Sequence, residues 1–330
     1  MNPTNALATA FTRDLGISYP IICGPMYPCS NPELVAAVSA AGGIGIVQPI
    51  SLTYVYGYDF RAGLRYIKSL TDKPIGMNAL IEKSSERYRA RMAQWIDIAL
   101  EEGVRFFITS LGKPDWVVNT VHAAGGIVYH DCTEMKWAEK GLACDVDGLI
   151  AVNNRAGGHA GGKNQQSLIQ ELAAFQVPVI CAGGIATGAD LAAALHQGYA
   201  GVQMGTRFIA SRECQVSDAY KKAIVDAQAE DIVMSERITG VPVAIIRTGA
   251  AQAKGLRAGP VARWLLRHPR GKHWMRMVYA LQSLYRLKHA SQQPSRSKDY
   301  WQAGKSVAGI TAIETVNIIV ENLVAGIDTN

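Results

Sequence analysis

The sequence lacks the features that mark membrane, disulfide-rich and metal-binding proteins. No stretch approaches the ~18 consecutive apolar residues of a membrane-spanning helix, and residues 1–20 hold no apolar core of signal-peptide length. The six cysteines form no CxxC pair, and no cluster of His, Asp or Glu has the spacing of a metal site. We therefore expect a cytoplasmic protein with reduced thiols, without a membrane span and without a bound metal.

Acidic residues are nearly absent from the segment 251–300. It holds 11 of the 33 Lys and Arg residues and one of the 27 acids, so the net charge of +6 originates here. Three interpretations stay open: helices that cover the protein and present a solvated basic face, a surface that steers an anionic substrate such as a phosphorylated nicotinamide or a CoA group, and a module that docks on an anionic membrane or nucleic acid. An apolar helical face runs from Trp274 to Tyr285. We favour the first interpretation and expect no nucleic-acid partner.

The GxGxxG motif that a Rossmann domain carries after its first strand is also missing, since the first apolar run ends in Gly24-Pro25-Met26. Instead, short apolar runs alternate with helical patterns. Runs that are apolar throughout are typical of parallel strands buried on both faces. The predicted strands are Ile21–Cys23, Ile44–Val47, Pro74–Met77, Phe106–Thr109, Ile127–Tyr129, Gly148–Val152, Val177–Cys181 and Gly201–Met204. The predicted helices between them are Pro32–Ala41, Phe60–Leu70, Ser85–Glu102, Asp115–Ala124, Glu134–Leu142, Ser167–Phe175 and Gly188–His196.

Eight strand–helix units within about 205 residues favour an α/β fold with a (β/α)8 TIM barrel over a doubly wound sheet. We predict the barrel for residues 1–205 and helical additions for residues 206–330. In the second part, residues 206–250 have a helical and mixed pattern and residues 251–300 form the basic segment. Ser306–Val324 has the spacing of a helix that packs back on the barrel.

Small, polar and glycine residues follow the predicted strands, where a barrel of this type has its active site. The most informative positions are Gly183-Gly184 and Gly205-Thr206, in the loops after the seventh and eighth strands. Loops at these two positions often bind phosphate through backbone N–H groups and a helix N-terminus, so we predict a phosphate site there. His130 follows the fifth predicted strand and is a further candidate for the site.

One histidine stands in an unusual run of glycines. Residues 153–166 read NNRAGGHAGGKNQQ and place His159 between two glycine pairs after the sixth strand. Because glycine loses the most backbone freedom on folding, such a run indicates either a close approach of a ligand or a loose turn. The position at a strand end, facing the two phosphate-type loops, favours the first.

Five motifs, in this order and spacing, resemble those of the nitronate monooxygenases, formerly named 2-nitropropane dioxygenases. They are IICGPM, GMNAL, RAGGHAGG, ICAGGIATG and VQMGTRF, and the resemblance covers about residues 15–250. These enzymes are FMN-dependent barrels related to flavin NADH:quinone reductases and to a flavin enoyl-ACP reductase. The resemblance implies FMN as cofactor and His159 as catalytic base. The implied FMN site consists of Gly24, Pro25, Met26, Asn78, Gly183, Gly184, Gln203, Met204, Gly205 and Thr206, to which we add His130.

Within that site, the resemblance places the FMN phosphate at Gly184, Gly205 and Thr206. It places the isoalloxazine along Gly24–Met26, with its polar edge at Asn78. A flavin-contacting glutamine of some members matches Gln165 or Gln166.

The chemistry implied by the resemblance is the oxidation of alkyl nitronates or nitroalkanes with O2. A neutral nitroalkane must first lose its α-proton, and a histidine of ordinary pKa is suited to remove it near neutral pH. The alternative is an NAD(P)H-dependent flavin reductase that acts on a quinone or an enoyl thioester. A role as a membrane or nucleic-acid binding module, carried by residues 251–300, is the non-enzymatic alternative. The use of NAD(P)H and a homo-oligomeric state are left open.

The sequence departs from the family pattern at two positions. Arg155 stands where the family commonly has an acidic residue before the glycines, and Asp131 stands where some quinone-reductase relatives carry a lysine near the flavin. Three tyrosines after the second strand, Tyr54, Tyr56 and Tyr58, form either a lid over the substrate or an aromatic patch on the barrel rim.

Overall fold

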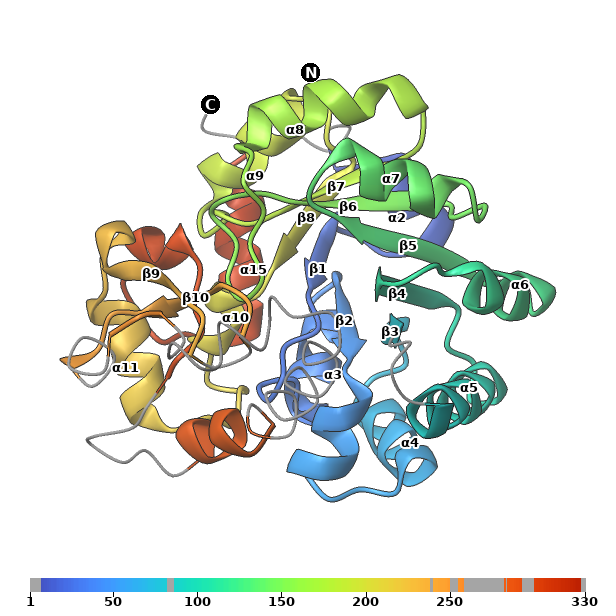
Figure 1. The fold of residues 1–330 in the computed structure, drawn as a ribbon, viewed down its shortest axis with the longest axis horizontal. Coiled ribbons are helices and arrows are strands. Elements are labelled where there is room, and N and C mark those ends of the chain that lie inside the picture. Colours follow the sequence, from blue (N-terminus) through green and yellow to red (C-terminus); the bar gives the residue numbers. More distant parts are fainter. Residues whose placement is uncertain are drawn as a thin grey trace.

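The computed structural model describes residues 7–81, 86–237, 240–249, 255–257, 282, 284–292 and 300–327. Eight parallel strands pair in chain order and close into a barrel, because β8 also pairs with β1 (Figure 1). The (β/α)8 fold predicted from the sequence is thus confirmed. The strands are β1 (Ile21–Cys23), β2 (Ile44–Val47), β3 (Ile75–Ile81), β4 (Phe106–Leu111), β5 (Ile127–Cys132), β6 (Gly148–Val152), β7 (Val179–Ala182) and β8 (Gly201–Met204).

Helices follow the strands and surround the barrel. The first seven are α3 (Pro32–Ala40), α4 (Phe60–Leu70), α5 (Glu86–Glu101), α6 (Asp115–Ala123), α7 (Met135–Leu142), α8 (Gln165–Leu172) and α9 (Gly188–His196). Two short segments, the π-helix η1 (Ser51–Val55) and the 3-10 helix η2 (Ala173–Phe175), lie before α4 and after α8. In the described ranges, no helix combines the length and apolar character needed to cross a membrane. No group of His, Cys, Asp and Glu side chains in them is arranged to hold a metal ion.

The strands are apolar on both faces because each face meets a different core. Inward-facing side chains such as Ile22, Ile46 and Ile150 fill the barrel, while their sequence neighbours pack under the helices. This alternation gives every strand residue an inner or an outer position. It therefore decides which residues beyond each strand can reach the mouth of the barrel.

The N-terminal end of the barrel is closed by α2 (Ala10–Leu15), a helix not predicted from the sequence. Its Phe11 is fully buried against Phe106 and Tyr129, with ring centroids 5.8 and 5.6 Å away. Tyr129 in turn fits over Gly148, where a Cβ atom would lie 2.4 Å from the ring. These rings make a solid floor below the site.

After β8, the chain forms α10 (Thr206–Ile209), α11 (Asp218–Asp226), the 3-10 helix η3 (Ala229–Asp231) and an antiparallel pair of strands, β9 (Ile232–Ser235) and β10 (Val243–Ile246). Figure 1 shows α11, β9 and β10 together at one side of the barrel. We had expected a helical and mixed pattern here and did not predict the strand pair. The two strands are short, and their pairing depends on a register between them that local patterns do not reveal.

The helix expected at Ser306–Val324 is shorter than predicted. The 3-10 helix η4 (Lys305–Gly309) comes first, and α15 (Val316–Ala325) begins only after Thr315, whose hydroxyl accepts the N–H of Ile318 at 3.4 Å. Glu314, just before this cap, is held by an ion pair with the buried Arg207. Because α15 packs against both α3 and α9, it takes the eighth place in the ring of helices.

The chain between α10 and α15 is consequently inserted into the last strand–helix unit. The domain boundary at residue 205 stays a prediction. Most of the basic segment, including the apolar face from Trp274 to Leu281, lies outside the described residues. Residues 284–292 are helical, and Lys288 and Ser291 in this helix contact the loop after β2 and the start of α11.

Candidate cofactor and active site

On three strands, the row of inward-facing side chains ends in a polar residue near the C-terminal end of the barrel. In β8 and β5, Gln203 and Asp131 continue the inner rows of Gly201 and Tyr129, and in β3 Asn78 continues that of Gly76. Asn78 is buried, and its side-chain amide donates one N–H to the carbonyl of Ile108 at 3.2 Å. The layer of the barrel interior at the C-terminal ends of the strands therefore holds amide and carboxyl groups, whereas the rest of the interior is apolar.

Two oxygens of this layer are buried without a hydrogen-bond partner in the described part of the chain, Oδ1 of Asp131 and Oε1 of Gln203. Burial raises the pKa of Asp131 to about 7, so its carboxyl group is partly protonated at neutral pH. A buried polar atom without a partner costs about 1–3 kcal/mol. Both oxygens are thus suited to a ligand that brings N–H or O–H donors into the barrel mouth.

The first and last barrel loops meet through glycines. A Cβ atom on Gly24 would lie 2.9 Å from Cγ of Gln203, and one on Gly205 would lie 3.2 Å from Sδ of Met26. The Gly24 N–H donates to the carbonyl of Met204 at 3.0 Å. The predicted residues after β1 and β8 therefore lie in contact with one another. Because Gly24 has no side chain, it leaves space for the amide of Gln203.

The loop after β7 adopts backbone conformations that require glycine, whereas Gly205 after β8 has a φ angle of −115°, which other residues also adopt. Gly183 and Gly184 have φ angles of +116° and +84°, a region that other residues rarely adopt. Thr206 begins α10 directly after Gly205, and its buried hydroxyl accepts the N–H of Gly304 at 2.9 Å. The loop after β8 is thereby tied to the chain that returns before α15.

Asn153 links the loops after β6 and β7 and is not among the site residues predicted from the sequence. Its side chain is completely buried, donates to the carbonyl of Gly183 at 2.9 Å and accepts the N–H of Arg155 at 2.8 Å. Its main chain bonds Ala182 and Gly161. An asparagine immediately after a buried strand was the available signal, but the glycines of the same loop outweighed it.

The glycines around His159 have identifiable structural roles. A Cβ atom on Gly157 would lie 3.0 Å from the Gly304 nitrogen, and one on Gly161 would lie 2.3 Å from the Val152 carbonyl oxygen. Gly158 has a φ angle of +65°, and its carbonyl accepts the N–H of Ala244 in β10 at 2.7 Å. Only Gly162 of the four faces open space. The loop is therefore packed closely on its neighbours, not loose.

His159 itself reaches solvent from this loop. The surrounding protein nevertheless removes part of the water around its ring, and this desolvation lowers the pKa of His159 below its ordinary value. The imidazole is consequently neutral near pH 7, which is the form that can accept a proton.

His130 does not lie at the site, contrary to the prediction. Its ring packs against α7, where a Cβ atom on Gly141 would lie 2.9 Å from Cδ2 of His130, and its Nδ1 is 2.8 Å from the hydroxyl of Thr109. Burial lowers the pKa of His130 to about 4. The side chain thus belongs to the outer face of β5, and Asp131 takes the inner position because strand residues alternate.

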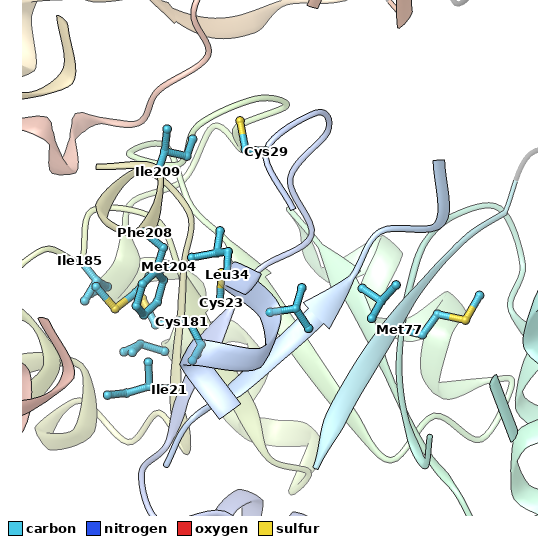
Figure 2. Close-up of a cluster of buried hydrophobic side chains, with 14 of the residues drawn as sticks. Ile21, Cys23, Cys29, Leu34, Met77, Cys181, Ile185, Met204, Phe208 and Ile209 are labelled. Atoms are coloured by element: carbon cyan, nitrogen blue, oxygen red, sulfur yellow. The ribbon is translucent and has the colours of Figure 1, made fainter. Parts of the chain in front are cut away.

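Met204 contributes no side chain to the mouth either. Figure 2 shows it beside Phe208 and Ile185, in the core between barrel and helices. Its carbonyl accepts the Gly24 N–H, so its part in the site is limited to the backbone.

The tyrosines after β2 pack on the rim to different degrees. Tyr56 donates its hydroxyl to the carbonyl of Pro28 at 3.0 Å, and Tyr58 stacks on Tyr66 at 5.6 Å. Tyr54 is 47% exposed, with Nζ of Lys288 4.4 Å from its ring centroid. The packing interpretation holds for Tyr56 and Tyr58.

Comparison with known proteins identifies the family. The family model described as nitronate monooxygenase matches residues 9–326. The chain belongs to the nitronate monooxygenase family. It is therefore an enzyme of a family of flavin-dependent oxidoreductases, as the five motifs indicated.

Two relatives and one solved structure show the range of similar proteins. The chain is 32% identical to (3aS,4S,5R,7aS)-5-hydroxy-7a-methyl-1-oxo-octahydro-1H-indene-4-carboxyl-CoA dehydrogenase of Rhodococcus jostii. The aligned 245 residues cover 74% of this chain and 67% of that protein. The chain is 30% identical over 273 residues to the nitronate monooxygenase of Pseudomonas aeruginosa, which covers 70% and 77%. The structure of FabK from Thermotoga maritima superposes with a TM-score of 0.81 at 28% identity, over 97% of this chain and 96% of that one.

Proposed function

We propose that the protein is an FMN-dependent oxidoreductase that takes hydrogen from a carbon next to an electron-withdrawing group, and that its substrate is a coenzyme A thioester. The observation that carries the first part is the barrel mouth itself. It combines two glycine loops of phosphate-binding type, buried oxygens without partners and a neutral histidine.

The residues at the mouth fit a flavin mononucleotide. Gly184, Gly205 and Thr206 would hold its phosphate, as in the phosphate loops of other barrels. The Gly24–Met26 turn offers a surface without a side chain at its first position. The free oxygens of Gln203 and Asp131 would accept the donors that FMN carries, which are its ring N–H and its ribityl hydroxyls. When bound, FMN supplies a two-electron acceptor for hydride.

His159 would act as the base. Of the two hydrogens that the substrate would lose, His159 would take one as a proton on a ring nitrogen, and the other is the hydride for which FMN would supply the acceptor. The lowered pKa keeps the imidazole free to take the proton. Its glycine-flanked loop is held between β10 and the turn at Gly304, so the ring is carried by a fixed backbone.

The choice of a coenzyme A thioester rests on two observations. The Rhodococcus relative, at 32% identity, is named as a dehydrogenase of a carboxyl-CoA compound. The segment 251–300 carries 11 basic residues and a single acid, a balance that attracts a polyanion such as the phosphates of coenzyme A. A thioester also acidifies its α-proton, which is the proton that a histidine base would remove.

Oxidation of nitroalkanes or nitronates is the second candidate. It is favoured by the name of the matched family and by the Pseudomonas relative at 30% identity. The same base would serve it, because a nitro group acidifies the neighbouring C–H as a thioester does.

Anaerobic flavin spectroscopy separates the candidates. The purified yellow protein would be titrated with free coenzyme A and with pantetheine, and then mixed with acyl-CoA esters, propyl-2-nitronate, NADH or NADPH while the visible flavin absorbance is followed. We expect coenzyme A to perturb the spectrum at lower concentration than pantetheine. Rapid bleaching by the nitronate, without any response to coenzyme A, would establish the second candidate. Bleaching by NADH that an enoyl-CoA or a quinone reverses would establish the reductase direction. A protein that neither contains nor takes up a flavin would overturn the proposal as a whole.

A further inference from the structure

Arg155 lies directly against the glycine loop after β7. A Cβ atom placed on Gly184 would be 2.6 Å from Nε and 2.9 Å from Cδ of Arg155, so the arginine side chain crosses the backbone of that glycine. Gly184 can accept this neighbour because it has no side chain and adopts a φ angle of +84°. The guanidinium group is thereby carried to one of the two loops of phosphate-binding type.

The backbone of Arg155 is fixed on both sides. Its N–H donates to Oδ1 of Asn153 at 2.8 Å, and its carbonyl accepts the N–H of Lys305 at 2.9 Å. The same Asn153 side chain donates to the carbonyl of Gly183 at 2.9 Å. One buried side chain therefore sets the distance between the arginine and the glycine loop, which is the arrangement expected of a binding residue.

No carboxylate in the described part of the chain pairs with the Arg155 guanidinium. The acid that follows the glycine loop, Asp190, is engaged elsewhere, since its carboxylate accepts the N–H groups of Ala186 and Thr187. Arg155 is exposed and offers five N–H donors in a planar fork that matches phosphate oxygens. The loop thus presents an uncompensated positive charge beside two glycines.

We propose that the guanidinium of Arg155 binds a phosphate group at the Gly183–Gly184 loop. The ligand is a phosphate ester, either the phosphate of the flavin or a phosphate of a coenzyme A substrate. The inference rests on the proposed function, and it concerns the position at which this sequence departs from the acidic residue of the family pattern that its motifs resemble. An acidic side chain so close to Gly184 would repel the anion that Arg155 attracts.

Paired ligands with and without the phosphate test this directly. Apoprotein of the wild type, Arg155→Gln and Arg155→Lys would be titrated with FMN and with riboflavin, with quenching of flavin fluorescence as readout. The flavin-loaded proteins would then be titrated with coenzyme A and with pantetheine. The control variant is Lys305→Gln, which removes an exposed cation from the segment that bonds the Arg155 carbonyl. Circular dichroism would verify that each variant is folded.

We expect Arg155→Gln to weaken binding of one phosphorylated ligand about 10- to 100-fold, the range of a hydrogen bond to a charged group. Binding of its phosphate-free partner should stay unchanged, Arg155→Lys should restore part of the loss, and Lys305→Gln should cost less than about threefold. A loss confined to FMN assigns the phosphate to the cofactor, and a loss confined to coenzyme A assigns it to the substrate.

Unchanged ratios of FMN to riboflavin and of coenzyme A to pantetheine would overturn the assignment of Arg155, as would equal losses for both members of each pair. A wild-type protein that binds neither FMN nor riboflavin would instead overturn the proposed function. The two failures are therefore distinguishable.

Discussion

The two ends of the barrel interior contrast in chemistry although the same strands build both. At the N-terminal end, Phe106 packs edge to face against Phe11 and Tyr129, and all three rings belong to one buried hydrophobic cluster. At the C-terminal end, the inward positions hold Gln203 and Asp131, each with a buried oxygen that has no partner in the described residues. One end contributes stability, and the other retains unsatisfied groups for a ligand.

Strand β5 contributes both to the apolar N-terminal end and to the polar C-terminal end of the barrel interior within three residues. Tyr129 and Asp131 point inward, whereas His130 between them points outward under α7. The tyrosine ring fills the barrel floor, and the carboxyl group two residues later stands at its mouth. A step of about 7 Å along one strand thus separates structural from functional chemistry.

The largest effect on stability is expected at the floor. Phe11→Ala should lower the free energy of unfolding by about 3–5 kcal/mol, because it removes a fully buried ring and leaves a cavity between Phe106 and Tyr129. Urea unfolding followed by circular dichroism measures this. Phe11→Leu is the milder control, and flavin affinity of the folded variant should match that of the wild type. A loss below about 1 kcal/mol would show that the cluster of Phe11, Phe106 and Tyr129 does not contribute the stability that we assign to it.

At the mouth, His159→Asn should reduce turnover of substrates that need deprotonation by about 100-fold or more, the typical contribution of a general base. Stability and FMN affinity should change little, since the ring is exposed. The comparison of neutral 2-nitropropane with propyl-2-nitronate is an internal control, because the nitronate has already lost its proton. Equal turnover of the neutral compound by both proteins would exclude His159 as the base.

Two adjacent glycines at the mouth should respond differently. Gly161→Ala should cost about 1–3 kcal/mol, because the new methyl group would meet the Val152 carbonyl at 2.3 Å. Gly162→Ala, which faces open space, should stay within about 0.5 kcal/mol of the wild type. Thermal or urea unfolding of the two variants provides the comparison. Similar losses for both would mean that the loop is not packed as tightly as its contacts indicate.

The smallest effect concerns pH and separates the two faces of β5. Burial raises the pKa of Asp131 to about 7, so the folded state holds more protons than the unfolded state from about pH 4 to 7, and stability falls as pH rises. Burial lowers the pKa of His130 to about 4, so the unfolded state holds more protons up to about pH 6.5, and stability rises with pH. The two trends oppose each other.

Substitution of either group should therefore reveal the trend of the other. Relative to the flavin-free wild type between about pH 4 and 6.5, the slope of stability against pH should become more positive in Asp131→Asn and more negative in His130→Gln, each by at most about 1.4 kcal/mol per pH unit. Urea midpoints at several pH values measure both slopes. A slope that moves in the opposite direction from the wild type in either variant would contradict the burial of the group that it replaces.

Much of the fold was accessible from local patterns. The repeated apolar runs and helical periods specify the eight strands and seven of the surrounding helices, with strand ends displaced by up to four residues, as for β3. The glycines of the loops after β6 and β7 were also recognised, because positive φ angles and close backbone contacts require glycine wherever they occur.

Local patterns did not predict which side of the sheet a residue near a strand end would occupy. The fifth strand continues to Cys132, and its inward row includes Asp131 instead of His130. A shift in the apparent end of a strand does not alter its alternation, so a residue chosen as the first one after the strand can point away from the site.

The sequence by itself determined the repeating strand–helix units, the family and the loops that depend on glycine, because each is written in short, contiguous motifs. Only the tertiary structure decided how Phe11 closes the floor, how Asn153 joins two loops and how Thr206 meets Gly304, a partner 98 residues away. It also placed Arg155 on Gly184. These contacts join distant segments, and their geometry is set by closure of the barrel and not by any local preference of the chain.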